Sequence, residues 1–169
     1  MEFSNDVVFP AGLPQTSEVE FRPLERDYLV VLRITWLIFF GTLWLAFGLA
    51  CFLTSFFSVA GIMITAGVLF ILSLYTWLSF TINFHKSGYA LRENDILVKR
   101  GWLVRRTRVV PMNRVQHVSI QSGPIERKYG LSSVSVYTAG TSTDISIRGI
   151  RKETAEQVRE WISSRIHEQ

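Results

Sequence analysis

A long stretch without ionisable side chains constrains this 169-residue chain more than any other feature. Between Arg33 and His85 the sequence contains no Asp, Glu, Lys, Arg or His. A helix needs about 20 apolar residues to cross the hydrocarbon core of a membrane, so this stretch has room for two crossings and a short turn. The rest of the chain is too short to cover so much apolar surface in a soluble protein. The sequence therefore predicts an integral membrane protein with a hairpin of two transmembrane helices.

The charges at the ends of this stretch predict its orientation. We expect the membrane helices at residues 29–53 and 59–82, joined by a short turn without charge. Arg26 and Arg33 flank the start of the first helix, and Lys86 and Arg92 follow the second. Because cytoplasmic flanks carry the excess of Lys and Arg, we expect a multi-pass protein of the cytoplasmic (inner) membrane with both termini in the cytoplasm.

Charge is divided unevenly between the two ends of the chain. Residues 1–33 carry three arginines against six acidic residues, and residues 85–169 carry fifteen Lys and Arg against eight acidic residues. The net charges are therefore −3 and +7, so the basic character belongs to the C-terminal part. Cys51 is the only cysteine, which excludes a disulfide framework or a cysteine metal site within one chain.

After Gly88 the apolar residues alternate with a period of two in short runs that end at turn residues, a pattern typical of antiparallel strands. We expect strands at residues 89–91, 96–100, 103–110, 115–121, 133–138 and 144–148, with a helical turn at 125–129. A helix at 152–166 should bury Trp161 and Ile162 against the strands. The predicted organisation is a cytoplasmic N-terminal segment (1–27), a two-helix transmembrane hairpin (28–84) and a mostly β cytoplasmic domain (85–169).

Several short motifs in the third part resemble a known family. The chain has YAL at 89–91, ILV at 96–98, RTRVVPMNRVQHV at 106–118 and GPIERKYGLSSV at 123–134, all after two membrane helices. This pattern resembles the YdbS-like membrane-flanked proteins, which carry a bacterial pleckstrin-homology domain. The resemblance implies an α+β, mostly β fold of two near-orthogonal antiparallel sheets capped by a C-terminal helix. Because folds host many activities, it implies much less about function.

The residue pattern does not favour catalysis. His85, His117 and His167 are too far apart in sequence to form a metal-binding pair on one helix. His117 and Ser119 share a strand face, but they lack the third group and the sequence context of a hydrolytic site. The membrane stretch has no ionisable residue for a proton or ion pathway. We therefore expect no enzyme activity, no catalytic or metal site and no cofactor.

Basic residues concentrate in two consecutive predicted strands and the turn after them. We call these residues the basic cluster: Lys99, Arg100, Arg105, Arg106, Arg108 and Arg114. Three interpretations remain open for it: ordinary solvated strand faces that also enforce the topology, contact with anionic lipid headgroups, or pairing with an acidic protein. A nucleic-acid site is not expected, because no series of aromatic residues accompanies these cations.

These observations favour a non-enzymatic function. We expect a membrane-anchored scaffold or interaction protein whose pleckstrin-homology-like domain binds a protein partner, a second copy of itself or the inner leaflet. The alternative is an auxiliary subunit of a membrane transporter or of an envelope-stress system.

Overall fold

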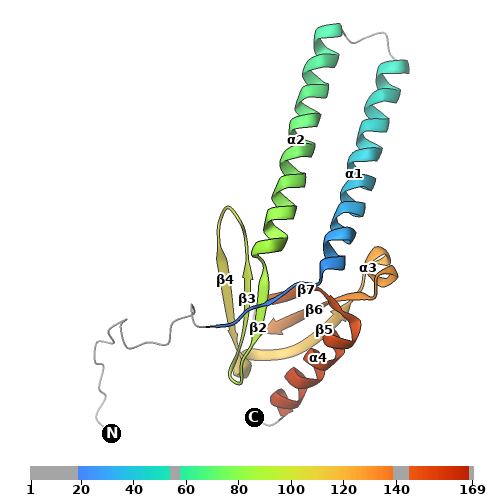
Figure 1. Cartoon of the computed structure of the whole chain (residues 1–169). Helices are drawn as coiled ribbons and strands as arrows, with labels where there is room; N and C mark the ends of the chain where they lie inside the picture. Colours follow the sequence, from blue (N-terminus) through green and yellow to red (C-terminus); the bar gives the residue numbers. More distant parts are fainter. Residues whose placement is uncertain (1–18, 54–57, 139–144, 168–169) are drawn as a thin grey trace, which may run out of the picture.

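Two long helices rise side by side from a mostly β domain in the computed structural model, which describes residues 19–53, 58–138 and 145–167 (Figure 1). The helices α1 (Arg26–Leu53) and α2 (Val59–Lys86) have 28 residues each. At 1.5 Å per residue each is about 42 Å long, more than the roughly 30 Å of a hydrocarbon core. Both extend beyond their predicted ends into the charged flanks, to Arg26 and to Lys86. Most of their large apolar side chains are exposed, as a lipid environment requires.

Aromatic and polar side chains join the two helices near the β domain. Trp36 Nε1 of α1 donates a hydrogen bond to Thr76 Oγ1 of α2 over 3.0 Å. The Trp36 and Trp77 rings meet edge to face with their centroids 4.9 Å apart, and the Arg33 guanidinium lies 5.7 Å from the centroid of Trp77. Trp side chains of this kind concentrate at membrane–water interfaces, so this level of the hairpin is suited to the headgroup region.

Four antiparallel strands form the first sheet, sheet A, in the order β1-β2-β3-β4. They are β1 (Arg22–Pro23), β2 (Gly88–Leu91), β3 (Asp95–Arg100) and β4 (Arg106–Pro111). Two differences from the sequence prediction matter. Strand β1 lies in the segment expected to precede the membrane hairpin, so that segment contributes to the β domain. The strand expected from residue 103 begins only at Arg106, because Gly101 takes a φ of 100° and turns the chain.

Three further strands form sheet B, in the order β5-β6-β7. They are β5 (Val115–Gln121), β6 (Leu131–Thr138) and β7 (Ile145–Arg151). A short 3-10 helix, η3 (Met112–Arg114), leads from sheet A into β5, and the short helix α3 (Pro124–Lys128) connects β5 to β6. Pro124 at the start of α3 and Gly130 with a φ of 64° just after it mark the ends of this helix.

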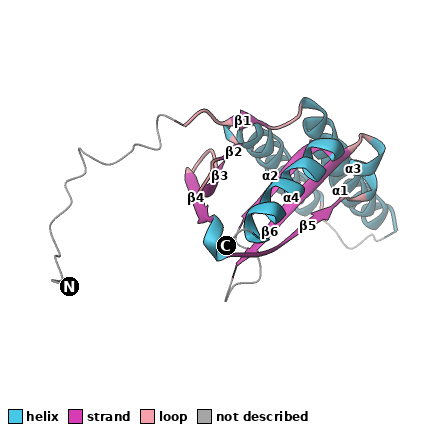
Figure 2. Ribbon diagram, turned by 90° about the horizontal axis from the view of Figure 1, so that it is seen from below, coloured by secondary structure: helices cyan, strands magenta, loops and turns pink. Residues whose placement is uncertain are grey.

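The C-terminal helix α4 (Lys152–His167) covers sheet B (Figure 2). Its apolar side packs into a core built from both sheets, and Ala155 and Ile162 are completely buried. Trp161 is only partly buried against the edge of that core. The prediction that α4 caps the strands is thus confirmed, and the expected burial is complete for Ile162 but partial for Trp161.

The β domain is attached closely to the feet of both helices. The Glu25 amide, just before α1, donates to the Gly149 carbonyl oxygen of β7 over 3.0 Å. The ring of Tyr28 packs against Gly149, whose φ is 66°. At the other foot only Ser87 separates α2 from β2, and the Gly101 amide donates to Asn83 Oδ1 over 3.0 Å. The domain is therefore held at a defined distance from the membrane hairpin.

Candidate anion site at the feet of the membrane helices

Three arginines share the inner face of sheet A because of the register between β3 and β4. Residues directly opposite one another in an antiparallel pair project to the same side of the sheet. The pairs on this face are Ile96–Val110, Val98–Arg108 and Arg100–Arg106. Along this face, apolar core residues are therefore replaced by basic residues toward the turn that joins β3 and β4.

These arginines line a cavity of about 270 Å³ between sheet A and β7. Its lining residues are Val98, Arg100, Arg106, Arg108, Ile145 and Ser146. The Arg100 guanidinium donates a hydrogen bond to the Ser146 carbonyl oxygen, which links the end of β3 to β7. Ser146 also lines a neighbouring cavity of about 540 Å³, together with Tyr28 and Arg148. Arg100, Arg106 and Arg108 line the first cavity, Arg148 lines the second and Ser146 lines both, and we call these five residues together the basic cavity.

Positive charge accumulates around a half-buried guanidinium in the basic cavity. Burial lowers the pKa of Arg100, and the positive charges of Arg148 and Arg108 lower that pKa further. Because an arginine side chain does not lose its proton in proteins, the repulsion persists and remains only partly screened. An anion in this place would interact with several guanidinium groups at once, and charge-assisted hydrogen bonds of this type are the strong ones.

One carboxylate faces the neighbouring cavity but is already engaged. Glu126 Oε2 accepts a hydrogen bond from the Gly123 amide over 2.8 Å, and Oε1 accepts one from Ser133 Oγ over 3.4 Å. Gly123 directly precedes α3, and Ser133 belongs to β6. The Glu126 carboxylate therefore stabilises the start of α3 and links it to β6.

The basic cavity lies on the side of the domain from which the helices rise. Arg100 precedes Gly101, which is hydrogen-bonded to Asn83 in the last turn of α2. Arg148 precedes Gly149, which contacts Tyr28 in the first turn of α1. Strands β3 and β7 both approach the feet of the helices (Figure 1), so Arg100 and Arg148 lie at this end of the domain.

The structure divides the basic cluster predicted from the sequence. Arg100, Arg106 and Arg108 come together, whereas Lys99 projects to the opposite face of β3, with its ammonium 5.5 Å from the centroid of the Phe21 ring. Arg105 is exposed in the turn between β3 and β4. Arg114 is exposed in η3, beyond the other end of β4. The six residues do not form one continuous surface.

Sequence reasoning missed Arg148, the fourth cation of the basic cavity. It lies about forty positions from the cluster in the sequence and reaches the cavity only because β7 lies beside β3. A local signal was present in Arg148-Gly149, a cation next to a glycine inside a strand, since such a glycine marks a bulge or a close approach of another segment.

His117 and Ser119, the two residues considered for a hydrolytic site, both lie in β5. The His117 ring stacks on Tyr137 with a centroid distance of 4.3 Å and an interplanar angle of 12°. Ser119 Oγ is buried without a hydrogen-bond partner among the described residues. Among all the residues that the structure describes, no group of three or more His, Cys, Asp or Glu is placed to hold a metal ion.

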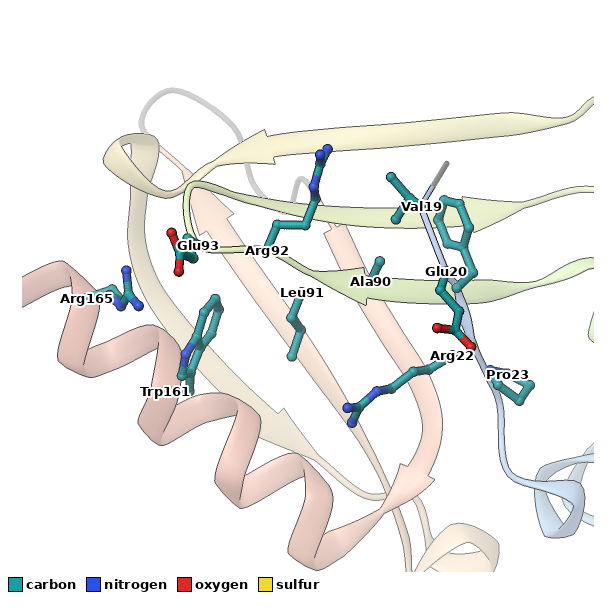
Figure 3. Close-up of a pocket in the computed structure, with 11 residues that line it drawn as sticks. Val19, Glu20, Arg22, Pro23, Ala90, Leu91, Arg92, Glu93, Trp161 and Arg165 are labelled. Atoms are coloured by element: carbon teal, nitrogen blue, oxygen red, sulfur yellow. The ribbon is translucent and has the colours of Figure 1, made fainter. Parts of the chain in front are cut away.

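A larger and more open cavity, of about 980 Å³, lies between sheet A and the C-terminal half of α4 (Figure 3). Arg22, Arg92 and Arg165 line it, but so do Glu20 and Glu93. Trp161 extends from α4 toward the turn between β2 and β3 (Figure 3). Because both signs of charge are present, this cavity has less excess charge than the basic cavity and is a weaker candidate for an anion.

Comparison with known proteins accounts for this architecture. Residues 30–166 match the family described as bacterial PH domain. The chain belongs to the bacterial PH domain family. This bacterial PH domain protein is also 39% identical over 75 residues to the transmembrane protein YdbS of Bacillus subtilis (strain 168). The aligned stretch covers 44% of this chain and 46% of YdbS, so it spans about half the length of that relative. No solved structure matches the chain.

The family and the fold agree with the architecture expected from the sequence. This bacterial PH domain protein is a YdbS-like membrane protein with transmembrane helices, followed by two antiparallel sheets and a capping C-terminal helix. The predicted fold class and the resemblance to the YdbS-like family are therefore confirmed.

Proposed function

We propose that this protein is a non-enzymatic, membrane-anchored interaction protein whose PH-like domain binds anionic phosphate headgroups of the inner leaflet in the basic cavity. The observation that carries this proposal is the half-buried Arg100, which lines a cavity together with Arg106 and Arg108 and whose pKa is lowered by burial and by the charges of Arg148 and Arg108. A lipid phosphate supplies the opposite charge and several acceptor oxygens in one group.

The membrane hairpin supports this proposal by fixing the position of the cavity. A domain held by two helix feet does not have to be recruited from solution, so weak contacts are enough to occupy the site. The potential of an anionic leaflet decays within a Debye length, about 8 Å at physiological salt. The hydrogen bond from Gly101 to Asn83 and the contact of Gly149 with Tyr28 hold the cavity close to the helix ends.

The alternative is a protein partner, as an auxiliary subunit of a membrane transporter or of an envelope-stress system would have. The observation that favours this alternative is the open cavity between sheet A and α4, which has apolar, acidic and basic lining residues (Figure 3). A surface of mixed character suits a protein or a second copy of this chain better than a headgroup. The two functions use different surfaces and are compatible with each other.

Loss of two cations from the basic cavity is expected to weaken anionic lipid binding. Each cation near an anionic leaflet contributes roughly 1 kcal/mol, so Arg100→Gln with Arg148→Gln should lower the affinity for phosphatidylglycerol about 30-fold. Native mass spectrometry of the full chain in mild detergent measures retained phosphatidylglycerol against phosphatidylcholine. Arg114→Gln is the matched control, since Arg114 is exposed outside the cavity. Equal retention of both lipids, or unchanged retention in the double variant, would contradict the proposal.

The same proposal requires a particular topology, with residues 1–27 and 85–169 both on the cytoplasmic side. Alkaline phosphatase is active only after export, so a fusion after Gln169 and a fusion before Met1 should both be inactive. A phosphatase inserted after Phe56, between the two membrane helices, should be active and serves as the control. An active fusion after Gln169 would place the PH-like domain on the wrong side of the membrane and overturn the function proposed here.

A further inference from the structure

The tip of the β3–β4 hairpin exposes three large apolar side chains in a row. Trp102 is 36% exposed, Leu103 72% and Val104 59%, and Arg105 and Arg106 follow them directly. We call residues 102–105 the hairpin tip. Scattered apolar residues on a protein surface are ordinary, but a contiguous exposed group flanked by cations marks an interaction surface.

The backbone builds this tip in a defined conformation. Gly101 has a φ of 100°, a region that residues with a side chain rarely adopt. A Cβ atom at this position would overlap the carbonyl oxygen of Val104. The chain thus folds back tightly between Gly101 and Val104, and this turn pushes the intervening side chains outward instead of continuing the strand. Glycine at position 101 is therefore required for the exposure of the apolar tip.

The hairpin tip is located beside the C-terminal end of α2, where the helix joins the β domain. The Gly101 amide donates to Asn83 Oδ1 over 3.0 Å, and beyond this bond the hairpin rises past the foot of α2 (Figure 1). Asn83 directly follows the apolar run of α2, and His85 and Lys86 complete the helix. Since charged residues at a helix end belong at the membrane surface, we expect this end of α2, and the hairpin tip beside it, at the level of the headgroups.

We propose that the hairpin tip inserts into the interfacial region of the bilayer that α1 and α2 cross. Trp102 takes the headgroup level that Trp36 and Trp77 occupy on the helices, Leu103 and Val104 enter the outer part of the acyl chains, and Arg105 contacts phosphate. An apolar segment with flanking cations binds a membrane surface in this way. The inference rests on the proposed function only in placing the domain against the bilayer, and insertion itself needs no anionic lipid.

The bilayer is favoured over other occupants by continuity with the membrane helices. The hydrogen bond to Asn83 fixes the tip next to α2. Leu78 and Ile82 of α2 are themselves exposed on the surface of the membrane hairpin. Lipid that covers these side chains also reaches the tip. A second copy of the chain or another protein would have to displace that lipid to cover the same surface.

Cysteine accessibility in the full chain tests this inference. In a Cys51→Ala background, Leu103→Cys and Asn94→Cys are compared in nanodiscs of neutral phosphatidylcholine, with a polar maleimide as the reagent. Asn94 is the matched control, because it is exposed in the turn at the other end of the same sheet. Insertion predicts labelling of Leu103→Cys about tenfold slower than that of Asn94→Cys, and equal rates after denaturation in sodium dodecyl sulfate. Equal rates in the nanodisc would overturn the inference.

A second measurement identifies what covers the tip. A fluorophore attached to Leu103→Cys should be quenched by brominated acyl chains, whereas one on Asn94→Cys should not. Slow labelling without quenching would mean that protein covers the tip, and the inference would then be wrong. The Arg100→Gln and Arg148→Gln substitutions should leave this protection unchanged, so failure of headgroup binding in the basic cavity remains distinguishable from failure of tip insertion.

Discussion

Replacing Ile162 by alanine is expected to lower the free energy of unfolding of the PH-like domain by about 2–5 kcal/mol. Ile162 is completely buried where α4 meets the core that both sheets share. Removal of its side chain leaves a cavity that the close-packed surroundings fill only in part. For a domain of this size the midpoint of thermal unfolding should fall by about 10 °C or more, as measured on the full chain in detergent by scanning fluorimetry.

Two other substitutions in α4 make this prediction specific. Arg159→Ala removes an exposed side chain one turn away and should change stability by less than about 0.5 kcal/mol. Trp161→Ala should cost less than Ile162→Ala, although tryptophan is larger, because Trp161 is only partly buried and borders the open cavity. If Ile162→Ala behaves like Arg159→Ala, α4 does not cap the core as described.

Replacing Gly149 by alanine is expected to disrupt the junction between the PH-like domain and α1. The φ of 66° costs a residue with a side chain about 1–3 kcal/mol. The new Cβ would also overlap the ring of Tyr28, and such overpacking adds about 1–3 kcal/mol. The change should further weaken the hydrogen bond from the Glu25 amide to the Gly149 carbonyl oxygen. Thermal unfolding of the full chain and protease sensitivity near residue 25 measure the loss.

The chain offers a matched control for the two effects at Gly149. Gly130 has nearly the same φ, 64°, but an added Cβ there would meet nothing within 4 Å. Gly130→Ala should therefore show the backbone effect alone, and Gly149→Ala should be clearly more destabilising. Combining Gly149→Ala with Tyr28→Gly removes both the ring and the Cβ of residue 28 that the new Cβ would overlap, so the double-mutant cycle should give a coupling of about 1 kcal/mol or more. Equal effects of the two glycine substitutions would refute the proposed contact.

The membrane hairpin and the order of the strands were predictable because they depend on local patterns. A stretch without charge between Arg33 and His85 has few ways to fold, and alternation with a period of two identifies half-buried strands. The boundaries were less accurate. Leu103 and Val104 have the composition of a strand, but the conformation of Gly101 excludes them from β4. A pair of residues such as Arg22–Pro23 is too short to produce a periodic pattern, so β1 could not be seen.

The candidate site was predictable only in part, since strand pairing decides which cations meet. Neighbours in the sequence project to opposite faces of a strand, so Lys99 and Arg100 separate although they are adjacent. Arg100, Arg106 and Arg108 meet through the β3–β4 register. Arg148 joins them through a contact between two sheets, and no local pattern encodes that contact.

By itself, then, the amino-acid sequence determined the membrane hairpin, the mostly β character of the following domain, its capping helix and its net positive charge. These properties are sums over local composition and periodicity, and they are independent of how distant segments pack. The tertiary structure alone decided that Arg100, Arg106 and Arg108 line one cavity beside β7 with Arg148 in the adjoining one, and that the apolar hairpin tip rises beside α2. Both results depend on close contacts between distant residues, Arg100 with Ser146 and Gly101 with Asn83, which exist only after the sheets and helices have packed.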